Sequence, residues 1–455
     1  MSFPRYPSYK DSGVAGLGDV PSHWEIKPLK HLAAIDSCGS YGVEAEEAEI
    51  ALPVATTAQI DANGGFAVDR MPVRGFAPAE VQRFGCSDGD ILVVKSSGSA
   101  TNIISGKVGL VDEATPLFVF SNFLMRVRPA KELATPKFIY ALLRSQLTRQ
   151  RVEQMCSTTT YPNLQVGEYC SAPLPIPPLP EQTAIAAFLD GETAKIDELV
   201  AEQRRLMELL KEKRQAVISH AVTKGLNPRA PMKPSGLEWL GDVPAHWEAR
   251  RISSLSTKIT NGYVGPTRDI LKDEGVRYLQ SLHIKGNEIR FDTPYFVSEE
   301  WSLEHSKSIL EAGDVLIVQT GDIGQSAVVP KEFVGCNCHA LIIVAPVRSH
   351  VDGSWISWVL NSDYGFHTLL SIQTGALHPH LNCGDIKDVF IPLPPLAEQR
   401  EIVSYIVEQV HRFDTLTAEA QRAIDLLQER RTALISAAVT GQIDVRGTRS
   451  VSLPN

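Results

Sequence analysis

The sequence predicts an α+β protein made of two copies of one unit, in which two α/β domains are separated by a pair of long antiparallel coiled-coil helices. Three observations predict this class. The chain is duplicated, each copy mixes buried-strand patterns with helical ones, and each copy ends in a long amphipathic run. Its 455 residues are enough for roughly two to four domains.

The duplication is read from short motifs that recur in the same order. GDVPSHWE at residues 18–25 recurs as GDVPAHWE at 241–248, and PPLPEQ at 177–182 recurs as PPLAEQ at 394–399. The shift between copies is 223 at the first motif (18 to 241), 224 at Gly89 and Gly313, and 217 from Pro129 and Pro346 onwards. The net length difference between the copies is therefore expected between about Gly98 and Ser121.

Each copy contains short apolar runs and longer runs with helical spacing. The runs that predict buried strands are Asp90–Lys95, Leu124–Arg128, Asp314–Gln319 and Ala340–Val344. The runs that predict helices are Phe138–Gln154 and Trp355–Ile372. This mixture favours an α+β domain in each copy.

A long helix without proline follows each proline-rich strap, from Glu181 to Ala221 in the first copy. Its apolar positions are three, four or seven residues apart, which is typical of a coiled coil, and the second copy repeats them at +217. We expect a seam formed by Ile185, Leu189, Ile196, Leu199, Leu206, Leu210, Val217 and Ala221, and by Ile402, Ile406, Phe413, Leu416, Ala423, Leu427, Leu434 and Ala438. The pattern allows parallel or antiparallel pairing, and antiparallel pairing would place the two domains at opposite ends.

Composition excludes a disordered, collagen-like or disulfide-dense chain. The chain has 43% hydrophobic residues, a net charge of −9, seven cysteines and no run of about 20 apolar residues. We therefore expect a cytoplasmic protein with no membrane association. A protein that coats nucleic acid unaided is usually basic, so any nucleic-acid contact here is expected from local patches or within a larger assembly.

Together, the duplicated halves, the PxHWE motifs, the GDxL strands, the P-P-L-x-E-Q straps and the two long helices resemble the specificity subunit of type I restriction-modification systems. The resemblance covers about residues 15–445. It implies that each domain reads one half of a bipartite double-stranded DNA target, and that the helices set the spacing. It divides the chain into target-recognition domain 1 (1–178), the first long helix (179–224), target-recognition domain 2 (225–395), the second long helix (396–441) and a tail (442–455).

The resemblance also implies partners and an absence of chemistry in this chain. The helices are expected to dock two methyltransferase subunits and, through them, the restriction/translocase subunits. The chain itself is expected to be non-catalytic and to hold no cofactor or metal. S-adenosylmethionine, ATP and magnesium are expected to be bound by the partner subunits.

Residues that read DNA should differ between the copies, whereas framework residues should match. His23, Trp24 and Asp90 have identical counterparts, so we expect them to be structural. The divergent polar loops offer side chains that pair with base edges or phosphates. The candidates in the first copy are Thr56, Thr57, Gln59, Lys95, Ser96, Ser97, Thr101, Asn102, Thr159, Tyr161 and Asn163. Those in the second copy are Gln280, Ser281, His283, Gln319, Thr320, Asp322, Gln325, Thr374, His378 and His380. Further possible phosphate contacts are Lys107, Arg126, Lys285 and Arg290.

Two other classes remain open. A self-contained DNA methyltransferase or nuclease would need a Gly-rich cofactor loop and an N/D-P-P-Y/F motif, and Ile176–Leu179 lacks the residues on either side of the prolines. A coiled-coil adaptor that binds only proteins is the second alternative. Cys336, Cys338, His339 and Cys383 could be imagined as a zinc cluster, but buried free thiols are the expectation.

Overall fold

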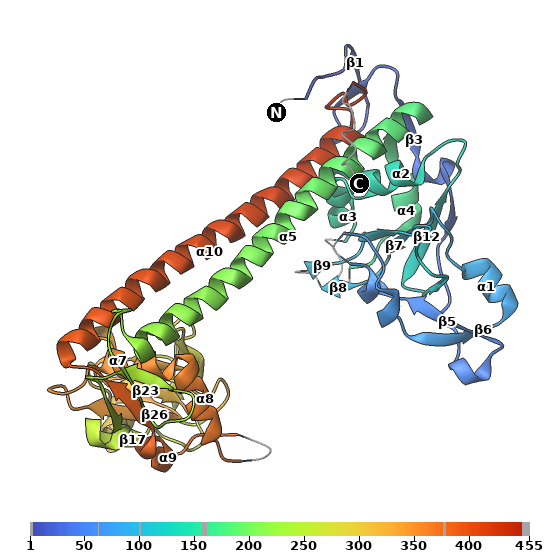
Figure 1. Ribbon diagram of the computed structural model, residues 1–455. Coiled ribbons are helices and arrows are strands. Elements are labelled where there is room, and N and C mark those ends of the chain that lie inside the picture. Colours follow the sequence, from blue (N-terminus) through green and yellow to red (C-terminus); the bar gives the residue numbers. More distant parts are fainter. Residues whose placement is uncertain (1–2, 62, 100–101, 157–161, 376–378, 448–455) are drawn as a thin grey trace. The chain divides into compact units, whose positions relative to one another are not determined.

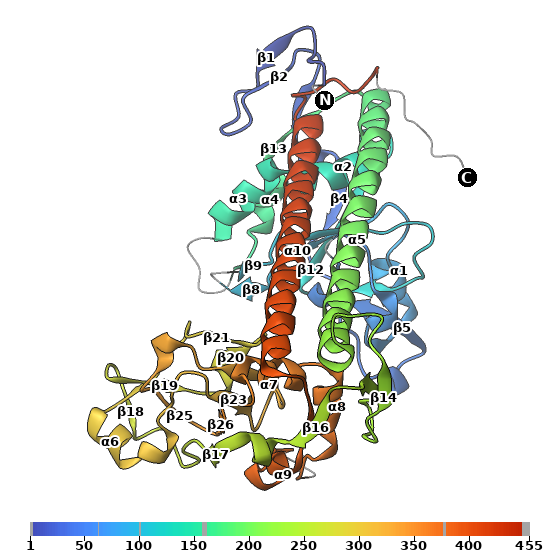
Figure 2. The ribbon, with the colours of Figure 1, turned by 60° about the vertical axis from the view of Figure 1, so that its left-hand side comes forward.

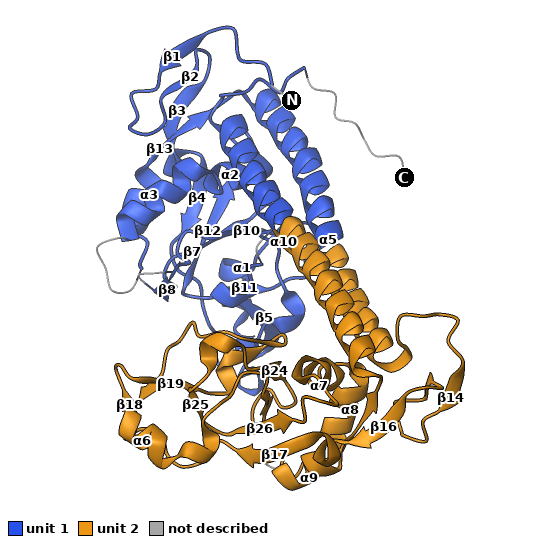
Figure 3. Ribbon diagram, turned by 90° about the vertical axis from the view of Figure 1, so that its left-hand side faces the viewer, with its two compact units in different colours: residues 1–203, 422–455 blue, residues 204–421 orange. Residues whose placement is uncertain are grey.

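The computed structural model describes residues 3–61, 63–99, 102–156, 162–375 and 379–447. The chain forms two compact units (Figure 3). Unit 1 consists of residues 1–203 and 422–455, and unit 2 of residues 204–421. Each unit therefore takes part of both long helices, α5 (Leu179–Lys224) and α10 (Leu396–Val439), as Figure 1 shows in green and red.

The two long helices run antiparallel within each unit. In unit 1, Ile185 and Leu189 near the start of α5 share a core with Ala438 and Val439 at the end of α10. In unit 2, the end of α5 and the start of α10 share a second core, to which Ile218, Ala221, Ile402 and Ile406 belong. Figure 2 shows the helices alongside each other. The predicted fold class, two α/β domains with a pair of packed long helices, is confirmed.

The seam between the helices differs from the predicted one in its middle. Leu199, Leu206 and Leu416 were placed on the seam, but their side chains are exposed, so those three assignments are wrong. Val200 and Ile424 are buried instead. The less exposed positions of α5 are alternately three and four residues apart, and two of them are polar, Gln203 and Arg214. A search for apolar residues alone therefore does not find this seam.

An ion pair fills the polar seam position in each unit. Arg431 Nε lies 3.3 Å from Asp197 Oδ1 in unit 1. Arg214 Nε lies 3.6 Å from Asp414 Oδ1 in unit 2. These four residues are related by the same +217 shift, so the two pairs are one contact made twice.

The centre of unit 1 is a four-stranded antiparallel sheet in the order β10-β7-β12-β4. Its strands are Val108–Leu110, Ile91–Val94, Leu124–Pro129 and Ala33–Asp36. Ile91 and Val93 face a core that includes α2 (Pro136–Leu143), whereas Leu92 and Val94 face a second core with Phe118 and Phe120. Burial on both faces explains why β7 is a continuous apolar run.

Smaller elements complete unit 1. A second sheet has the order β11-β5-β6 (Val119–Phe120, Ile50–Ala55 and Val73–Phe76). Two-stranded pairs are β1–β2 (Tyr9–Asp11 and Asp19–Pro21), β3–β13 (Glu25–Pro28 and Pro173–Ile176) and β8–β9 (Gly98–Ser99 and Asn102–Ile103). The helices are α1 (Pro78–Phe84), α2 (Pro136–Leu143), α3 (Gln146–Cys156) and α4 (Val166–Ser171).

Unit 2 repeats this plan around a sheet in the order β17-β26-β23-β24. Its strands are Ser256–Asn261, Leu341–Pro346, Val315–Val318 and Ser326–Val328. Val315 and Ile317 face one core while Leu316 and Val318 face another, as in β7. The second sheet has the order β18-β22-β19-β25 (Leu271–Lys272, Phe296–Val297, Val276–Leu279 and Asn337–Cys338).

The remaining strands of unit 2 form the pairs β14–β15 (Met232–Pro234 and Asp242–Pro244), β16–β27 (Glu248–Arg251 and Phe390–Leu393) and β20–β21 (Ile284–Lys285 and Glu288–Ile289). Its helices are α6 (Glu299–Glu304), α7 (Gly353–Leu360), α8 (Asp363–Ser371) and α9 (Cys383–Asp388). Among the described residues, no helix is both long enough and apolar enough to cross a membrane.

Each predicted helical run after the sheet is in fact two helices. Ser145 separates α2 from α3, and its equivalent Ser362 separates α7 from α8. The hydroxyl oxygen of Ser145 accepts a hydrogen bond from Thr148 N, and that of Ser362 accepts one from Gly365 N. A serine that caps a new helix explains the break, which apolar periodicity alone does not reveal.

Candidate nucleic-acid interface

In each unit, the histidine and tryptophan of the PxHWE motif contact the glutamate of the P-P-L-x-E-Q motif. We call this contact the clamp. In unit 1, Glu181 Oε1 accepts a hydrogen bond from Trp24 Nε1 at 3.0 Å, and Glu181 Oε2 lies 2.7 Å from His23 Nε2. In unit 2, Glu398 makes the same two contacts with Trp247 and His246 at 3.1 and 2.8 Å. The clamp ties the start of each domain to the start of a long helix, which confirms that these residues are structural.

The glutamine after the clamp glutamate ties down two further segments. Gln182 Oε1 accepts from Thr135 N, and its amide group donates to the carbonyl oxygens of Leu133 and Pro177. Gln399 makes the equivalent bonds to Asp352 N and to the carbonyl oxygens of His350 and Pro394. The P-P-L-x-E-Q motif is therefore a structural joint between strap, domain and helix.

Asp90 and Asp314 cap the turn before the central strand. Asp90 Oδ2 accepts from Ser87 N at 2.9 Å, and Asp314 Oδ2 accepts from Glu311 N at 2.9 Å. The predicted turn cap is confirmed in both units.

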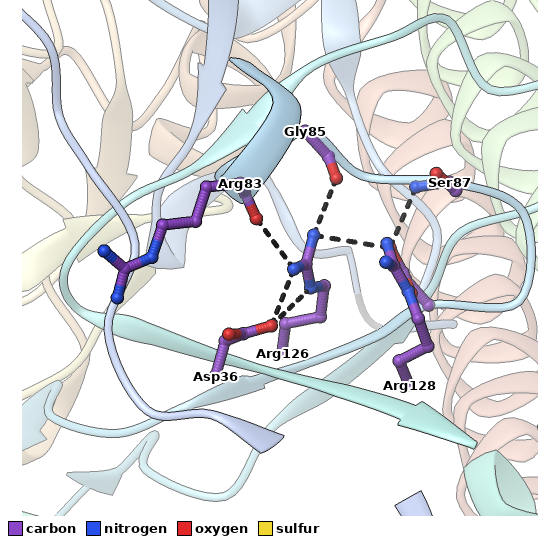
Figure 4. Close-up of polar contacts among 7 residues, drawn as sticks. Asp36, Arg83, Gly85, Ser87, Arg126 and Arg128 are labelled. Carbon is purple, nitrogen blue, oxygen red and sulfur yellow. Dashed lines mark hydrogen bonds and ion pairs between the residues drawn. The ribbon is translucent and has the colours of Figure 1, made fainter. Parts of the chain in front are cut away.

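Arg126, predicted as a phosphate contact, is instead part of the core of unit 1 (Figure 4). Its side chain is only 5% exposed. Its guanidinium group donates to Asp36 Oδ2 at 2.6 and 3.0 Å and to the carbonyl oxygens of Arg83 and Gly85. Because these donors are used and buried, the prediction of a phosphate contact at Arg126 is wrong.

The divergent loops occupy the same end of the central sheet in each unit. Leu164 N donates to Lys95 O at 2.7 Å in unit 1, and Leu381 N donates to Gln319 O at 3.1 Å in unit 2. This shared bond joins the loop after the central strand to the loop before the strap. Residues far apart in the sequence are thereby brought together at one sheet edge.

The loop after the central strand, which we call the strand-end loop, accounts for most of the length difference between the units. It comprises residues 95–107 in unit 1 and 319–325 in unit 2. Val93 pairs with Val108, fifteen positions later, whereas Ile317 pairs with Ser326, nine positions later. Six of the seven extra residues of the first copy therefore lie here, where the β8–β9 hairpin stands.

Most of the described unit-1 candidates lie around this loop. Ser97 Oγ donates to Thr57 Oγ1 at 3.4 Å, and Ser96 forms a β-bridge with Asn163. Thr56 caps the short helix that contains Thr57 and Gln59. Lys95 Nζ donates to Ser37 O, and Asn102 is exposed in β9. Thr101, Thr159 and Tyr161 lie outside the described residues.

In unit 2, the candidates divide between exposed and enclosed positions. Thr320, Asp322 and Thr374 are exposed, and Thr374 is bridged to His380. Gln319 and Gln325 are half-buried at the two ends of the strand-end loop, and Gln280 and Ser281 are half-buried in the segment equivalent to Thr56–Thr57. His378 lies outside the described residues.

His283 is fully buried, unlike the other candidates among the described residues. Its Nδ1 accepts from Gln280 N at 2.8 Å, and its Nε2 lies 2.9 Å from Thr293 O. Desolvation by burial lowers the pKa of His283. The geometry suits a residue that holds the Gln280–Ile284 segment in place.

The three cysteines that suggested a zinc cluster, Cys336, Cys338 and Cys383, are free thiols. Burial raises the pKa of Cys338 well above its usual range and that of Cys336 to about 11. Cys383 Sγ donates to Asn261 Oδ1. No group of three or more histidine, cysteine, aspartate or glutamate side chains among the described residues is arranged to hold a metal ion.

Sequence reasoning missed one segment at this sheet edge, the turn between β11 and β12. Lys95 N donates to Phe123 O at 2.9 Å, so this turn touches the strand-end loop directly. The shift between equivalent residues of the two copies also decreases by one at this turn. This signal was hidden in the sequence because the larger length difference in the strand-end loop lies nearby.

Comparison with known proteins identifies both halves of the chain. A model of the type I restriction modification DNA specificity domain matches residues 21–206 and 244–425. The specificity subunit of the type I enzyme EcoKI of Escherichia coli K12 is 25% identical over 94% of this chain and 90% of its own length. The putative MjaX specificity subunit of Methanocaldococcus jannaschii is 22% identical over 98% of this chain and 99% of its own length. The match to the EcoBI specificity subunit of Escherichia coli, at 24% identity, covers 68% of this chain and 65% of that protein.

Two solved structures share the fold. One, from a study of complex assembly and conformational transition of the type I restriction-modification system, superposes with a TM-score of 0.67 at 19% identity, covering 92% of this chain and 98% of the other. The HsdS subunit from Thermoanaerobacter tengcongensis superposes with a TM-score of 0.51 at 18% identity, covering 93% and 98%.

Proposed function

The chain belongs to the type I restriction-modification DNA specificity family, and on that premise we propose that it reads a bipartite double-stranded DNA target. Residues 1–178 form target-recognition domain 1 and residues 225–395 form target-recognition domain 2. Each domain reads one short sequence. The long helices, residues 179–224 and 396–441, set the gap between the two sequences, and residues 442–455 form a tail.

One observation carries this proposal: the two units share their framework contacts and differ in the loops that these contacts hold. The backbone bond from Leu164 to Lys95 has its equivalent from Leu381 to Gln319, but the strand-end loops differ in length and in side chains. A shared scaffold with different polar loops suits two heads that read different bases.

The proposed DNA contacts are the candidates that remain accessible near the sheet edge. In domain 1 they are Thr56, Thr57, Gln59, Lys95, Ser96, Ser97, Asn102 and Asn163, and in domain 2 they are Gln280, Ser281, Gln319, Thr320, Asp322, Gln325, Thr374 and His380. Thr101, Thr159, Tyr161 and His378 stay in the proposal on sequence grounds. We assign buried His283 a positioning role, because base contact would require its burial to be undone.

The proposed partners are two methyltransferase subunits and, through them, the restriction/translocase subunits. Support comes from exposed leucines that recur at equivalent helix positions. Leu199 of α5 and Leu426 of α10 are exposed in unit 1, and their equivalents Leu416 and Leu209 are exposed in unit 2. Exposed apolar side chains on a helix favour burial against a partner, and a surface that occurs twice favours a partner that binds twice.

In this proposal the chain performs no chemistry of its own. It selects the site, while the partner subunits bind S-adenosylmethionine, ATP and magnesium and carry out modification and cleavage. Measurable binding of S-adenosylmethionine by the isolated chain would instead favour the methyltransferase alternative.

The proposal is tested by selection from random duplex DNA with the full chain and its methyltransferase subunit. We expect enrichment of two short motifs separated by a fixed gap. Replacing residues 20–175 by another recognition domain should change one motif and leave the other intact. An unenriched pool would favour a protein-binding adaptor, and a simultaneous change of both motifs would contradict independent heads.

A second experiment tests the docking surface. Changing Leu199 and Leu416 together to aspartate should weaken binding of the methyltransferase subunit without unfolding the chain, since both side chains are exposed. Leu303→Asp is the matched control, because Leu303 is exposed and belongs to α6 rather than to a long helix. Equal binding by both variants would exclude this surface.

A further inference from the structure

The turn from Ser121 to Phe123 lies among the proposed DNA-reading segments of domain 1. Phe123 O accepts from Lys95 N at 2.9 Å, at the start of the strand-end loop. Asn122 O accepts a weak hydrogen bond from Cys38 Sγ at 3.9 Å, at the end of β4. The turn leads into β12 and therefore contacts the chain just beyond β7 and β4, the two strands that flank β12 in the sheet.

Phe123 projects from this edge although the strands on either side are buried. Phe120 before it and Leu124 after it are completely buried, whereas the Phe123 side chain is 52% exposed. Asn122 is also exposed. An exposed phenylalanine beside polar lysine and asparagine side chains contributes little to the core, so its position favours contact with something outside the domain.

The equivalent turn of unit 2 differs in length and chemistry. The β10 and β24 registers make Val108 equivalent to Ser326, a shift of 218, whereas Leu124 and Leu341 are equivalent at a shift of 217. One residue is therefore missing from unit 2 between these strands. The shorter turn contains Ala340, with a φ of 47°, which non-glycine residues rarely adopt.

Aromatic side chains occupy this place in unit 2. The His339 ring lies 6.4 Å from the Tyr263 ring and 6.2 Å from the Tyr278 ring, measured between centroids. His339 is half-buried, and Ala340 N donates to Tyr263 O. The framework on either side is in register while the turn differs, which is the pattern that the strand-end loops show.

We propose that these turns are a further pair of specificity-determining elements, with Phe123 in domain 1 and His339 in domain 2 as their base-contacting residues. Phe123 makes an apolar contact with a base, for which the thymine methyl group is the matching surface in the major groove. His339 Nδ1 lies 3.4 Å from the Tyr278 hydroxyl, so His339 offers its other ring nitrogen, Nε2, to a base edge. This inference rests on the proposed reading of DNA by the same sheet edge.

Selection from random duplex DNA with the full chain and its methyltransferase subunit tests the inference. Phe123→Ala should reduce the preference at one base pair of the first motif by about fivefold or more, with the second motif unchanged. Phe123→Leu keeps an apolar contact and should retain most of that preference. His339→Ala should change one position of the second motif only.

Leu117→Ala is the matched control. Leu117 is 50% exposed and precedes β11, so it has similar exposure in the same domain but stands at the other end of that strand. Thermal unfolding of each variant checks that the domain is intact.

The outcomes separate this inference from the function on which it rests. If the unmodified chain enriches no motif, the proposed function is wrong and the inference falls with it. If the unmodified chain enriches two motifs and folded Phe123→Ala selects the same bases as the Leu117 control, the inference is wrong while the function stands. Loss of both motifs by folded Phe123→Ala would also overturn it, because a base contact affects one motif.

Discussion

The central sheets of the two units differ in chemistry at one cross-strand position. In unit 1, Arg126 of β12 stands opposite Asp36 of β4, and the pair is completed by backbone carbonyl groups. In unit 2, the same position holds fully buried Ile343 opposite Thr260. The same fold therefore accepts a hydrogen-bonded ion pair or an apolar contact at one site.

This difference shows which contacts the fold requires. The clamp glutamate, the glutamine joint and the turn-capping aspartate occur in both units, so they set the architecture. The ion pair occurs once, so it is a local solution to filling the sheet. Substitutions made in one unit, or at equivalent positions of both, test this distinction between shared contacts and the contact found only in unit 1.

The largest effect is expected from breaking the ion pair on one side. Asp36→Ala removes the carboxylate that Arg126 contacts at 2.6 Å and leaves the nearly buried guanidinium group with the more distant Asp90 Oδ2, 3.9 Å away, as its charged partner. We expect unit 1 to lose about 3 kcal/mol of stability. Copying unit 2 with Asp36→Thr and Arg126→Ile together should cost less than the single change. Chemical denaturation of both variants measures this, and a double variant less stable than the single one would contradict a local role for the pair.

A smaller effect is expected at the clamp, and it should be unequal between units. Glu181 is 6% exposed and Glu398 is 28% exposed, although both make the same two contacts. We expect Glu181→Ala to cost about 2 kcal/mol and Glu398→Ala to cost less, because water can replace contacts at the more exposed site. Denaturation curves of the two variants measure the two losses of stability. Equal losses would show that burial does not set the strength of the clamp.

The ion pairs between the helices should matter less still. Asp197 and Asp414 are partly exposed, so each change to alanine is expected to cost below about 1 kcal/mol, with Asp197→Ala the larger. High salt should shrink both losses. A loss that is insensitive to salt would indicate that the aspartates act through helix geometry instead.

The smallest effect concerns the pH dependence of unit 2. Burial raises the pKa of Asp314, the bond from Glu311 N opposes this, and nearby charges are Glu311, Lys258 and Arg348. A carboxyl group with a raised pKa destabilises the folded state when it is ionised, so this cost is present above the raised pKa and fades as pH falls through it towards 3.8.

Asp314→Asn should therefore be slightly more stable than the unmodified chain near neutral pH, and the difference should decrease on acidification through that window. Stability measured for both proteins against pH provides the test. A difference that grows on acidification would contradict the sign of the shift.

The sequence was a good guide where a pattern is local or repeated. The duplication, the buried strands and the turn caps follow from apolar runs and matched motifs. It failed at Leu199 and Leu416 because polar Gln203 and Arg214 occupy seam positions, and at Arg126 because a cation paired with a distant aspartate looks the same in sequence as an exposed one.

The candidate site was predictable in its loops but not in its assembly. The divergent segments could be found by comparing the copies. Their meeting at one sheet edge depends on backbone bonds such as Leu164 to Lys95, which join residues almost seventy positions apart and leave no local pattern. The burial of His283 likewise depends on Thr293, in a segment that the pattern did not connect with it.

The division of both long helices between the units has a consequence for biosynthesis. Unit 2 is one continuous stretch, residues 204–421, and can complete its core as soon as that stretch has left the ribosome. Unit 1 needs Leu434, Ile435 and Ala438 from the far end of the chain to finish its own core. Unit 1 is therefore translated first but completes its core last. Its apolar surface stays uncovered while domain 2 is synthesised.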